Sequence, residues 1–275
     1  MKTKKTVYNY FVVLSFLCLT FGSDGLAAVS DSLAKPFHSR VSTSPGLSLH
    51  KDMYILFGSY SNEYYNRQTE TVFQISAKQN LFNSGVYLGY TQKSFWQAYD
   101  YKNSSPFRET NFNPEIFYRV LPGTYFHESL GADLGFEHES NGQNAPESRS
   151  WNRLYLAPYY QEGNTIIYSK CWYRLPESDK PFQGASEGDD NPDITDYMGY
   201  GELHLYQKLF DIHTIHAMAR GNITHHRGAL ALNYCLKIPS IKASFILSFF
   251  TGYGESLIDY NRSITRVGAG FYFNG

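Results

Sequence analysis

The sequence is poor in several features, and each scarcity excludes a class of protein. Only 3 of the 275 residues are cysteine, which excludes a small fold held together by a disulfide framework. The formal net charge is -1, so the chain has no cationic field for binding nucleic acid. Beyond the N-terminal segment the chain has no apolar run of about 18 residues, so a transmembrane helix is not expected there.

The first residues have the composition of a secretory signal peptide. Lysines near the start form a positive region, an apolar run follows over residues 10–21, and small residues end the segment. The sequence therefore predicts a signal peptide over residues 1–27, with cleavage after Ala27 or Ala28. Residues 28–50 are expected to form a poorly ordered lead-in.

Aromatic residues and alternating polarity are what the sequence has in abundance. Aromatic residues make up 17% of the chain, with 24 tyrosines against 3 tryptophans. From about residue 51 onward, segments of about ten residues alternate between apolar and polar positions, which is typical of strands. In residues 241–249, for example, every odd position is apolar, whereas Lys242, Ser244 and Ser248 lie on the opposite face.

About twelve such segments occur in residues 51–275, and an even number suits a closed antiparallel barrel. They lie near residues 51–60, 69–78, 84–96, 112–121, 127–140, 150–161, 164–174, 196–208, 212–221, 228–237, 241–251 and 264–273. Long polar connections fall at alternate joints, as they do when one barrel end has turns and the other has loops. The sequence therefore predicts an all-β protein, a twelve-stranded antiparallel transmembrane β-barrel.

A soluble β-sandwich is the alternative fold, because alternation alone does not distinguish lipid from a protein core. Strands of soluble sandwiches tend to be shorter, about five or six residues, so the longer segments favour the barrel. In a membrane barrel the charged residues of the polar faces would pair inside the lumen. These residues are Glu115, Arg119, Asp133, Glu137, Arg153, Glu202 and Arg266.

Three polar residues interrupt an apolar stripe near one of the long loops. His138 and Ser140 continue the strand face that carries Leu134 and Phe136, because side chains two positions apart point the same way. The chain then passes through a loop and returns with Asn152 on the apolar face of the next strand. If the two strands pair, serine, histidine and asparagine come together on the lipid-facing surface.

These residue types suit nucleophilic catalysis. Serine becomes a nucleophile when a base takes its proton, and histidine titrates near neutral pH. A third group must hold the imidazole in the right tautomer, and asparagine does so without placing an isolated charge near hydrocarbon. The alternative is an ordinary polar cluster at the barrel rim, which the spacing alone leaves open.

The stretch from His138 to Arg153, with His-Glu-Ser-Asn-Gly at its start and Ser-Arg-Ser-Trp-Asn-Arg at its end, resembles the active-site signature of outer membrane phospholipase A. Residues 104–111, 189–194 and 252–260 resemble other stretches of that family. The resemblance extends from about residue 53 to the end of the sequence. It implies an enzyme of the bacterial outer membrane that hydrolyses the sn-1 and sn-2 acyl esters of phospholipids, and also lysophospholipids.

The resemblance also implies a role for each site residue. Ser140 would be the nucleophile, His138 the base and Asn152 the group that orients it. A calcium ion would help the backbone N–H of Gly142 to form the oxyanion hole. Its ligands would be the Ser148 hydroxyl, the Gln143 carbonyl and the Ser104 carbonyl of a second subunit. Other members often have arginine in place of Gln143. This difference does not remove the ligand, because the ligand is a backbone carbonyl and every residue type has one.

A glutamine on the lipid-facing side indicates a second subunit. Gln92 shares the outward face of its segment, where a carboxamide without partners is costly. The resemblance implies that the protein is active as a dimer and that Gln92 lies at the dimer interface. The alternative places Gln92 near the aromatic belt, where it reaches water.

Two further alternatives remain open. The acidic cluster at residues 189–193 could bind a second calcium ion or could be a solvated loop. The chain could also be a non-catalytic outer-membrane barrel, either a narrow porin or a structural protein.

Overall fold

The computed structural model describes residues 37–62, 69–182, 185 and 187–273. All of them belong to one compact unit, Ala34–Gly275. The predicted signal peptide, residues 1–27, and the first part of the predicted lead-in lie outside the described residues.

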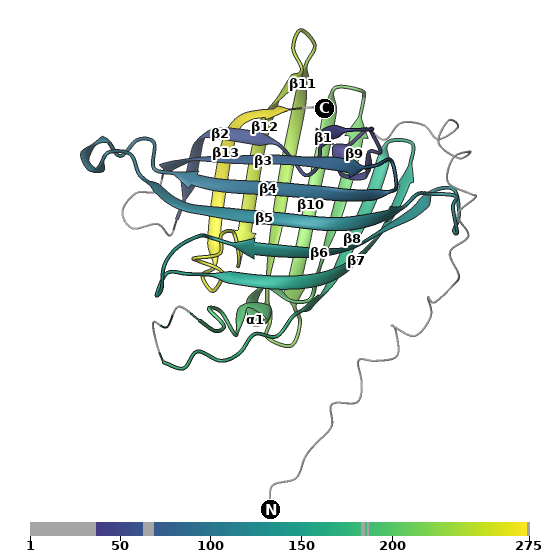
Figure 1. The fold of residues 1–275 in the computed structure, drawn as a ribbon. Helices are drawn as coiled ribbons and strands as arrows, with labels where there is room; N and C mark the ends of the chain where they lie inside the picture. The colour runs from purple at the N-terminus through teal and green to yellow at the C-terminus, as the bar shows by residue number, and fades with distance from the viewer. Residues whose placement is uncertain (1–36, 63–68, 183–184, 186, 274–275) are drawn as a thin grey trace, which may run out of the picture. The chain divides into compact units, whose positions relative to one another are not determined.

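Twelve antiparallel strands form a closed barrel (Figure 1). Each strand pairs with its neighbours in sequence, and the last strand pairs with the first of the ring, which closes the sheet. The strands are β2 (Tyr54–Ser61), β3 (Thr69–Leu81), β4 (Val86–Trp96), β5 (Phe107–Val120), β6 (Leu130–Ser140), β7 (Ser150–Glu162), β8 (Thr165–Arg174), β9 (Gly201–Leu209), β10 (His213–Asn222), β11 (Arg227–Ile238), β12 (Ala243–Gly252) and β13 (Ile264–Phe273). The predicted twelve-stranded barrel is confirmed.

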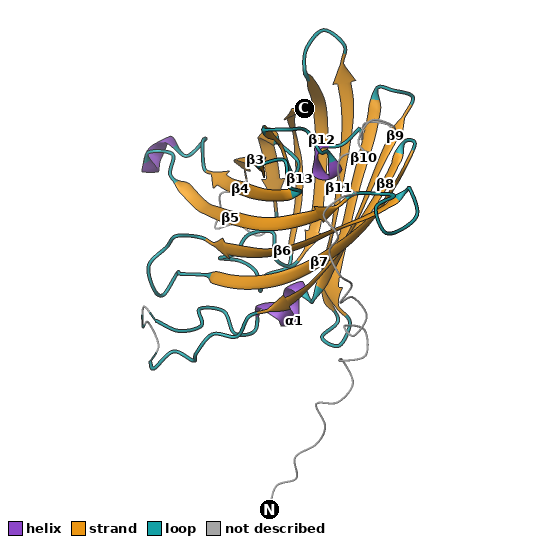
Figure 2. Ribbon diagram, turned by 45° about the vertical axis from the view of Figure 1, so that its right-hand side comes forward, coloured by secondary structure: helices purple, strands orange, loops and turns teal. Residues whose placement is uncertain are grey.

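The remaining elements are short. β1 (Leu47–Leu49) adds to one edge of β3. The helices, purple in Figure 2, are η1 (Ser39–Val41), η2 (Tyr101–Asn103) and α1 (Ile194–Met198). None of the helices in the described ranges is long and apolar enough to cross a membrane.

The prediction of a strand over residues 196–208 is wrong at its start. That part of the chain forms α1, and β9 begins only at Gly201. Thr195 and Met198 of α1 are buried, and the carbonyl of Thr195 accepts a hydrogen bond from the Asn222 side chain at 2.9 Å. These contacts with the end of β10 hold the segment as a helical turn, although its composition resembles that of a strand.

The two faces of the strands differ as the alternation predicts. Leu134 and Leu154 are exposed on the outer face, whereas Asp133 and Glu137 are each only 1% exposed. Because successive side chains of a strand point to opposite sides, one set faces lipid and the other lines the lumen. An apolar exterior around a polar interior is the arrangement of a transmembrane β-barrel.

Several buried charged residues of the lumen form ion pairs. Arg119 and Asp133 lie 2.7 Å apart, and both are buried. Glu137 contacts Arg153 at 3.0 Å and Lys170 at 2.7 Å, which connects β6, β7 and β8. A buried charge needs such a partner because burial removes its hydration.

The described part of the lead-in, residues 37–50, is packed rather than poorly ordered. Arg40 is 5% exposed, and its guanidinium donates a hydrogen bond to Tyr206 at 2.7 Å. The Arg40 carbonyl accepts from Arg119 at 2.7 Å, and the Ser39 carbonyl accepts from Lys78 at 2.6 Å. The expectation of poor order fails here because the segment supplies partners to buried cations of the lumen.

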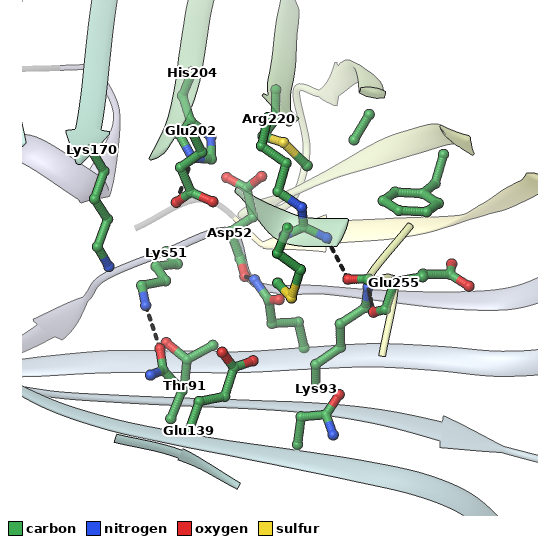
Figure 3. Close-up of a pocket in the computed structure, with 18 of the residues that line it drawn as sticks. Lys51, Asp52, Thr91, Lys93, Glu139, Lys170, Glu202, His204, Arg220 and Glu255 are labelled. Carbon is green, nitrogen blue, oxygen red and sulfur yellow. Dashed lines mark hydrogen bonds and ion pairs between the residues drawn. The ribbon is translucent and has the colours of Figure 1, made fainter. Parts of the chain in front are cut away.

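A polar cavity of about 220 Å³ lies inside the barrel (Figure 3). Lys51, Asp52, Lys170, His204 and Arg220 are among the side chains that point into it. Asp52 bonds both to His216 at 2.5 Å and to His38 at 3.0 Å. Side chains from the lead-in and from the strands therefore occupy much of the interior.

The pair Arg119–Asp133 gives a test of the lumen. We expect Asp133→Leu to lower the free energy of unfolding by about 3–5 kcal/mol, because it leaves a buried guanidinium without its carboxylate. Denaturant unfolding of the barrel in detergent measures this. The double variant Arg119→Leu/Asp133→Leu should recover only part of the loss, because the Arg40 and Ser42 carbonyls lose the Arg119 donor. Equal stability of Asp133→Leu and wild type would contradict the assigned pairing.

Candidate active site

The hairpin of β6 and β7 brings two of the predicted site residues together. In the register of this pair, His138 lies directly opposite Asn152, and Ser140 lies opposite Ser150. His138 Nδ1 and Asn152 Oδ1 are 2.9 Å apart. His138, Ser140 and Asn152 have the parity of Leu134 and so lie on the outer surface of the barrel.

The contact with asparagine sets the tautomer of the imidazole. A carboxamide oxygen only accepts hydrogen bonds, so this contact favours the tautomer with the proton on Nδ1, which leaves Nε2 as the acceptor. In the described part of the chain no hydrogen bond joins the Ser140 hydroxyl to this ring. Bonds between nucleophile and base are often looser without substrate, and Ser140 shares the strand face of His138.

Asn152 has a second polar partner that the sequence did not indicate. Its Nδ2 donates to Glu177 Oε1 at 3.3 Å. Glu177 lies in the long connection between β8 and α1, and the Leu175 amide donates to the Asn152 carbonyl at 2.8 Å. Strand alternation carries no information about such loop contacts, so no sequence signal could have found Glu177.

The loop between β6 and β7 is organised by one buried side chain, Asn141, which is 2% exposed. Its Oδ1 accepts from the amides of Gln143 at 3.3 Å and Arg149 at 2.9 Å. Its Nδ2 donates to the Glu147 carbonyl at 2.9 Å. Gly142 follows with a φ of 66°, a conformation that favours glycine. Strand alternation did not indicate this role of Asn141, although Asn-Gly is a known turn signal.

The predicted calcium ligands lie in two loops, with Gln143 and Ser148 between β6 and β7 and Ser104 between β4 and β5. The Ser148 hydroxyl donates to Asp190 Oδ2 at 2.6 Å, and Gln143 is exposed in the same loop as Ser148. Ser104 is exposed at the end of η2. Hydroxyl, carbonyl and carboxylate oxygens are the donors that a hard cation such as Ca²⁺ takes, so the residues present fit this ion.

The acidic cluster at residues 189–193 is bonded to protein donors. Asp189 pairs with Arg174 at 2.6 Å, and Asp190 pairs with Lys180 at 2.5 Å. Asp193 accepts a hydrogen bond from Tyr260. Across the described ranges no three His, Cys, Asp or Glu side chains are grouped as a metal site. These contacts add no support for the alternative of a second calcium ion at this cluster.

Gln92 faces outward from β4 but has partners within its own chain. Its Oε1 accepts from the Tyr90 hydroxyl at 3.0 Å, and its Nε2 donates to Ser94 Oγ at 3.2 Å. The premise of an unpartnered carboxamide is therefore wrong in part. The amide still has hydrogen-bonding capacity beyond these two bonds, and its place at a dimer interface stays a prediction.

Comparison with known proteins identifies the family. The family model described as phospholipase A1 matches residues 40–273. The chain belongs to the phospholipase A1 family. Membership confirms the predicted family and enzyme class, a phospholipase, and its barrel fold places it in the bacterial outer membrane.

Relatives from two bacteria show how far the similarity extends. A relative from Neisseria meningitidis serogroup B is 39% identical over 220 residues, which cover 76% of this chain but 55% of the relative. This chain therefore spans about half the length of that protein. The phospholipase A1 of Escherichia coli is 38% identical over 221 residues, which cover 76% of this chain and 71% of the relative.

Solved structures agree with the fold. Outer membrane phospholipase A from Escherichia coli has 32% sequence identity and a TM-score of 0.73, covering 83% of this chain and 98% of that one. A Salmonella typhi outer membrane phospholipase, described as a dimer with bound calcium, has 33% identity and a TM-score of 0.72, covering 83% of this chain and 92% of that one. An asparagine-to-alanine active-site mutant of the Escherichia coli protein, at 33% identity, has a TM-score of 0.73 and covers 83% and 91%.

The role of Asn141 in the loop is testable. We expect Asn141→Ala to speed amide hydrogen exchange in residues 141–149, because the Gln143 and Arg149 amides lose their acceptor. Mass spectrometry of peptides from the detergent-solubilised protein measures this. Asn144→Ala is the matched control, since Asn144 is exposed in the same loop. Equal exchange in both variants would show that Asn141 does not organise the loop.

Proposed function

We propose that this chain is a calcium-dependent phospholipase with a Ser140–His138–Asn152 triad on the lipid-facing surface of the barrel. Its substrates are the sn-1 and sn-2 acyl esters of phospholipids and lysophospholipids. The observation that carries the proposal is the bond of His138 Nδ1 to Asn152 Oδ1 at 2.9 Å, on the outer face of β6 and β7. There the acyl chains of a bilayer lie directly against the residues that would react.

The chemistry follows from the groups present. His138 Nε2 takes the proton of the Ser140 hydroxyl as the oxygen attacks the ester carbonyl. The tetrahedral intermediate collapses, the ester C–O bond breaks, and His138 returns the proton to the leaving alcohol of the lysolipid. Water then attacks the acyl-enzyme by the same route and releases the fatty acid. Asn152 keeps the imidazole in the tautomer that both half-reactions need.

The negative charge on the ester oxygen needs stabilisation near Ser140. We assign the backbone N–H of Gly142 to the oxyanion hole. The Ser148 hydroxyl, the Gln143 carbonyl and the Ser104 carbonyl of a second subunit would hold the calcium ion. When bound, Ca²⁺ supplies positive charge that lowers the cost of the oxyanion. The Salmonella typhi relative, a dimer with bound calcium, supports both the ion and the subunit contact.

A non-catalytic barrel is less well supported. The lead-in segment and paired lumen side chains occupy the interior, and the structure gives no observation that favours a porin. The active-site asparagine mutation of the Escherichia coli relative supports a working role for asparagine in this family, and we assign that role to Asn152.

Hydrolysis by the refolded barrel tests the proposal. Protein in detergent is incubated with a phospholipid or an acyl ester, either with calcium or with a chelator, and fatty acid release is measured. We expect release only with calcium, and we expect Ser140→Ala to lower kcat by about a thousandfold or more. Ser148→Ala should raise the calcium concentration that gives half-maximal activity, because one ligand is lost.

The matched control for Ser140→Ala is Ser150→Ala, since Ser150 lies opposite Ser140 on the neighbouring strand and has no assigned role. It should retain activity. Hydrolysis that survives Ser140→Ala would reject the mechanism. Absence of hydrolysis in calcium-loaded dimeric wild-type protein would favour the non-catalytic barrel.

Dimer formation gives a separate test. We expect Gln92→Ala to weaken calcium-dependent self-association by about tenfold, because one interfacial hydrogen-bonding group in an apolar surface is lost. Sedimentation in a density-matched detergent measures the dissociation constant. Gln207→Ala is the control, since this residue has the outward parity of Leu205 on β9, which is far from β4 in the strand order of the barrel. An unchanged constant in Gln92→Ala would remove Gln92 from the interface.

A further inference from the structure

We propose that Glu177 is a positioning residue for hydrolysis, which fixes the orientation of the Asn152 carboxamide and thereby the tautomer of His138. The inference rests on the proposed triad and extends it by one residue. Glu177 touches neither the nucleophile nor the base, and it acts only through Asn152, by the bond of Asn152 Nδ2 to Glu177 Oε1 at 3.3 Å.

An asparagine beside a histidine has an ambiguity that aspartate lacks. Its carboxamide can turn by half a rotation and present either the oxygen or the NH₂ group to the imidazole. Only the oxygen accepts the proton of His138 Nδ1. With the NH₂ group in that place, the ring would carry its proton on Nε2 and could not act as a base toward Ser140.

The carboxylate of Glu177 removes this ambiguity. An ionised carboxylate only accepts hydrogen bonds, so it binds the NH₂ group of Asn152 and repels the oxygen. The oxygen is thereby left for His138, as observed at 2.9 Å. The bond to a charged acceptor is also stronger than one to a neutral acceptor. The two contacts of Asn152 therefore select the same orientation.

The connection after β8 is braced so that Glu177 keeps its place. The Leu175 amide donates to the Asn152 carbonyl at 2.8 Å, which anchors the chain two residues before Glu177. The Ser178 carbonyl accepts from the Asp189 amide at 2.8 Å, and Asp189 pairs with Arg174 at 2.6 Å at the end of β8. Fixed points on both sides limit the motion of Glu177.

The first experiment measures kcat and KM for phospholipid hydrolysis by the calcium-loaded protein. We expect Glu177→Ala to lower kcat by about five- to tenfold with KM unchanged, the effect of one hydrogen bond acting on the barrier. Glu177→Gln should give a kcat between those of Glu177→Ala and wild type, because its carboxamide can accept the same bond but can also turn and donate to the Asn152 oxygen. Glu187→Ala is the matched control, an exposed glutamate of the same connection, and should match wild type.

The second experiment asks whether Glu177 acts through Asn152. In an Asn152→Ala background, Glu177→Ala should cause no further loss of kcat. In an Asn152→Asp background two carboxylates face each other, so adding Glu177→Gln should raise kcat. If Glu177 had a merely structural role in the loop, the effect of Glu177→Gln on kcat would have the same sign with asparagine and with aspartate at position 152.

The outcomes separate this inference from the proposed function. Loss of activity in Ser140→Ala, together with equal kcat in Glu177→Ala and Glu187→Ala, overturns the positioning role and leaves the triad intact. A Glu177→Ala loss of the same size in the Asn152→Ala background also overturns it. Activity that survives Ser140→Ala overturns the triad itself. Gel mobility of unheated samples shows that each barrel is folded.

Discussion

The register between β6 and β7 is the constraint on which the site depends. On the inner side this register pairs Glu137 with Arg153, and on the outer side it pairs His138 with Asn152. Lys170 of β8 adds a second cation to Glu137. Because strand side chains alternate, a slip by one residue would move every side chain to the other face. The buried ion pair therefore maintains the arrangement of groups that face the lipid.

The site combines parts of different rigidity. His138 and Asn152 are directly opposite each other on two paired strands of a closed sheet, the architecture that a chain inside hydrocarbon requires. Asn141, Ser148 and Glu177 are in loops. There the hydrogen bonds of side chains, rather than the pairing of strands, hold the chain in place. The division suits the proposed chemistry, since proton transfer needs constant geometry, whereas the proposed calcium ion and second subunit would reach the site from outside.

The sequence predicted what depends on local periodicity and failed where contacts are long-range. Alternation located all twelve strands and the outward face of His138, because a two-residue period acts at every position of a strand. It could not reveal that Arg40 enters the lumen or that Glu177 contacts Asn152, since these partners are separated in sequence and meet only after the barrel closes. The start of β9 was missed because burial of Thr195 and Met198 favours a helical turn over local strand propensity.

Ser140, the proposed nucleophile, faces outward, so the concentration that matters for the proposed reaction is that of lipids in the membrane. A nucleophile in a cleft samples molecules dissolved in a volume, whereas one on the outer wall of a barrel samples only the lipids in contact with that wall. A phospholipid reaches that wall by lateral diffusion within the bilayer. The frequency of this contact depends on the mole fraction of phospholipid in the leaflet that surrounds Ser140. It does not depend on the amount of lipid in the surrounding solution.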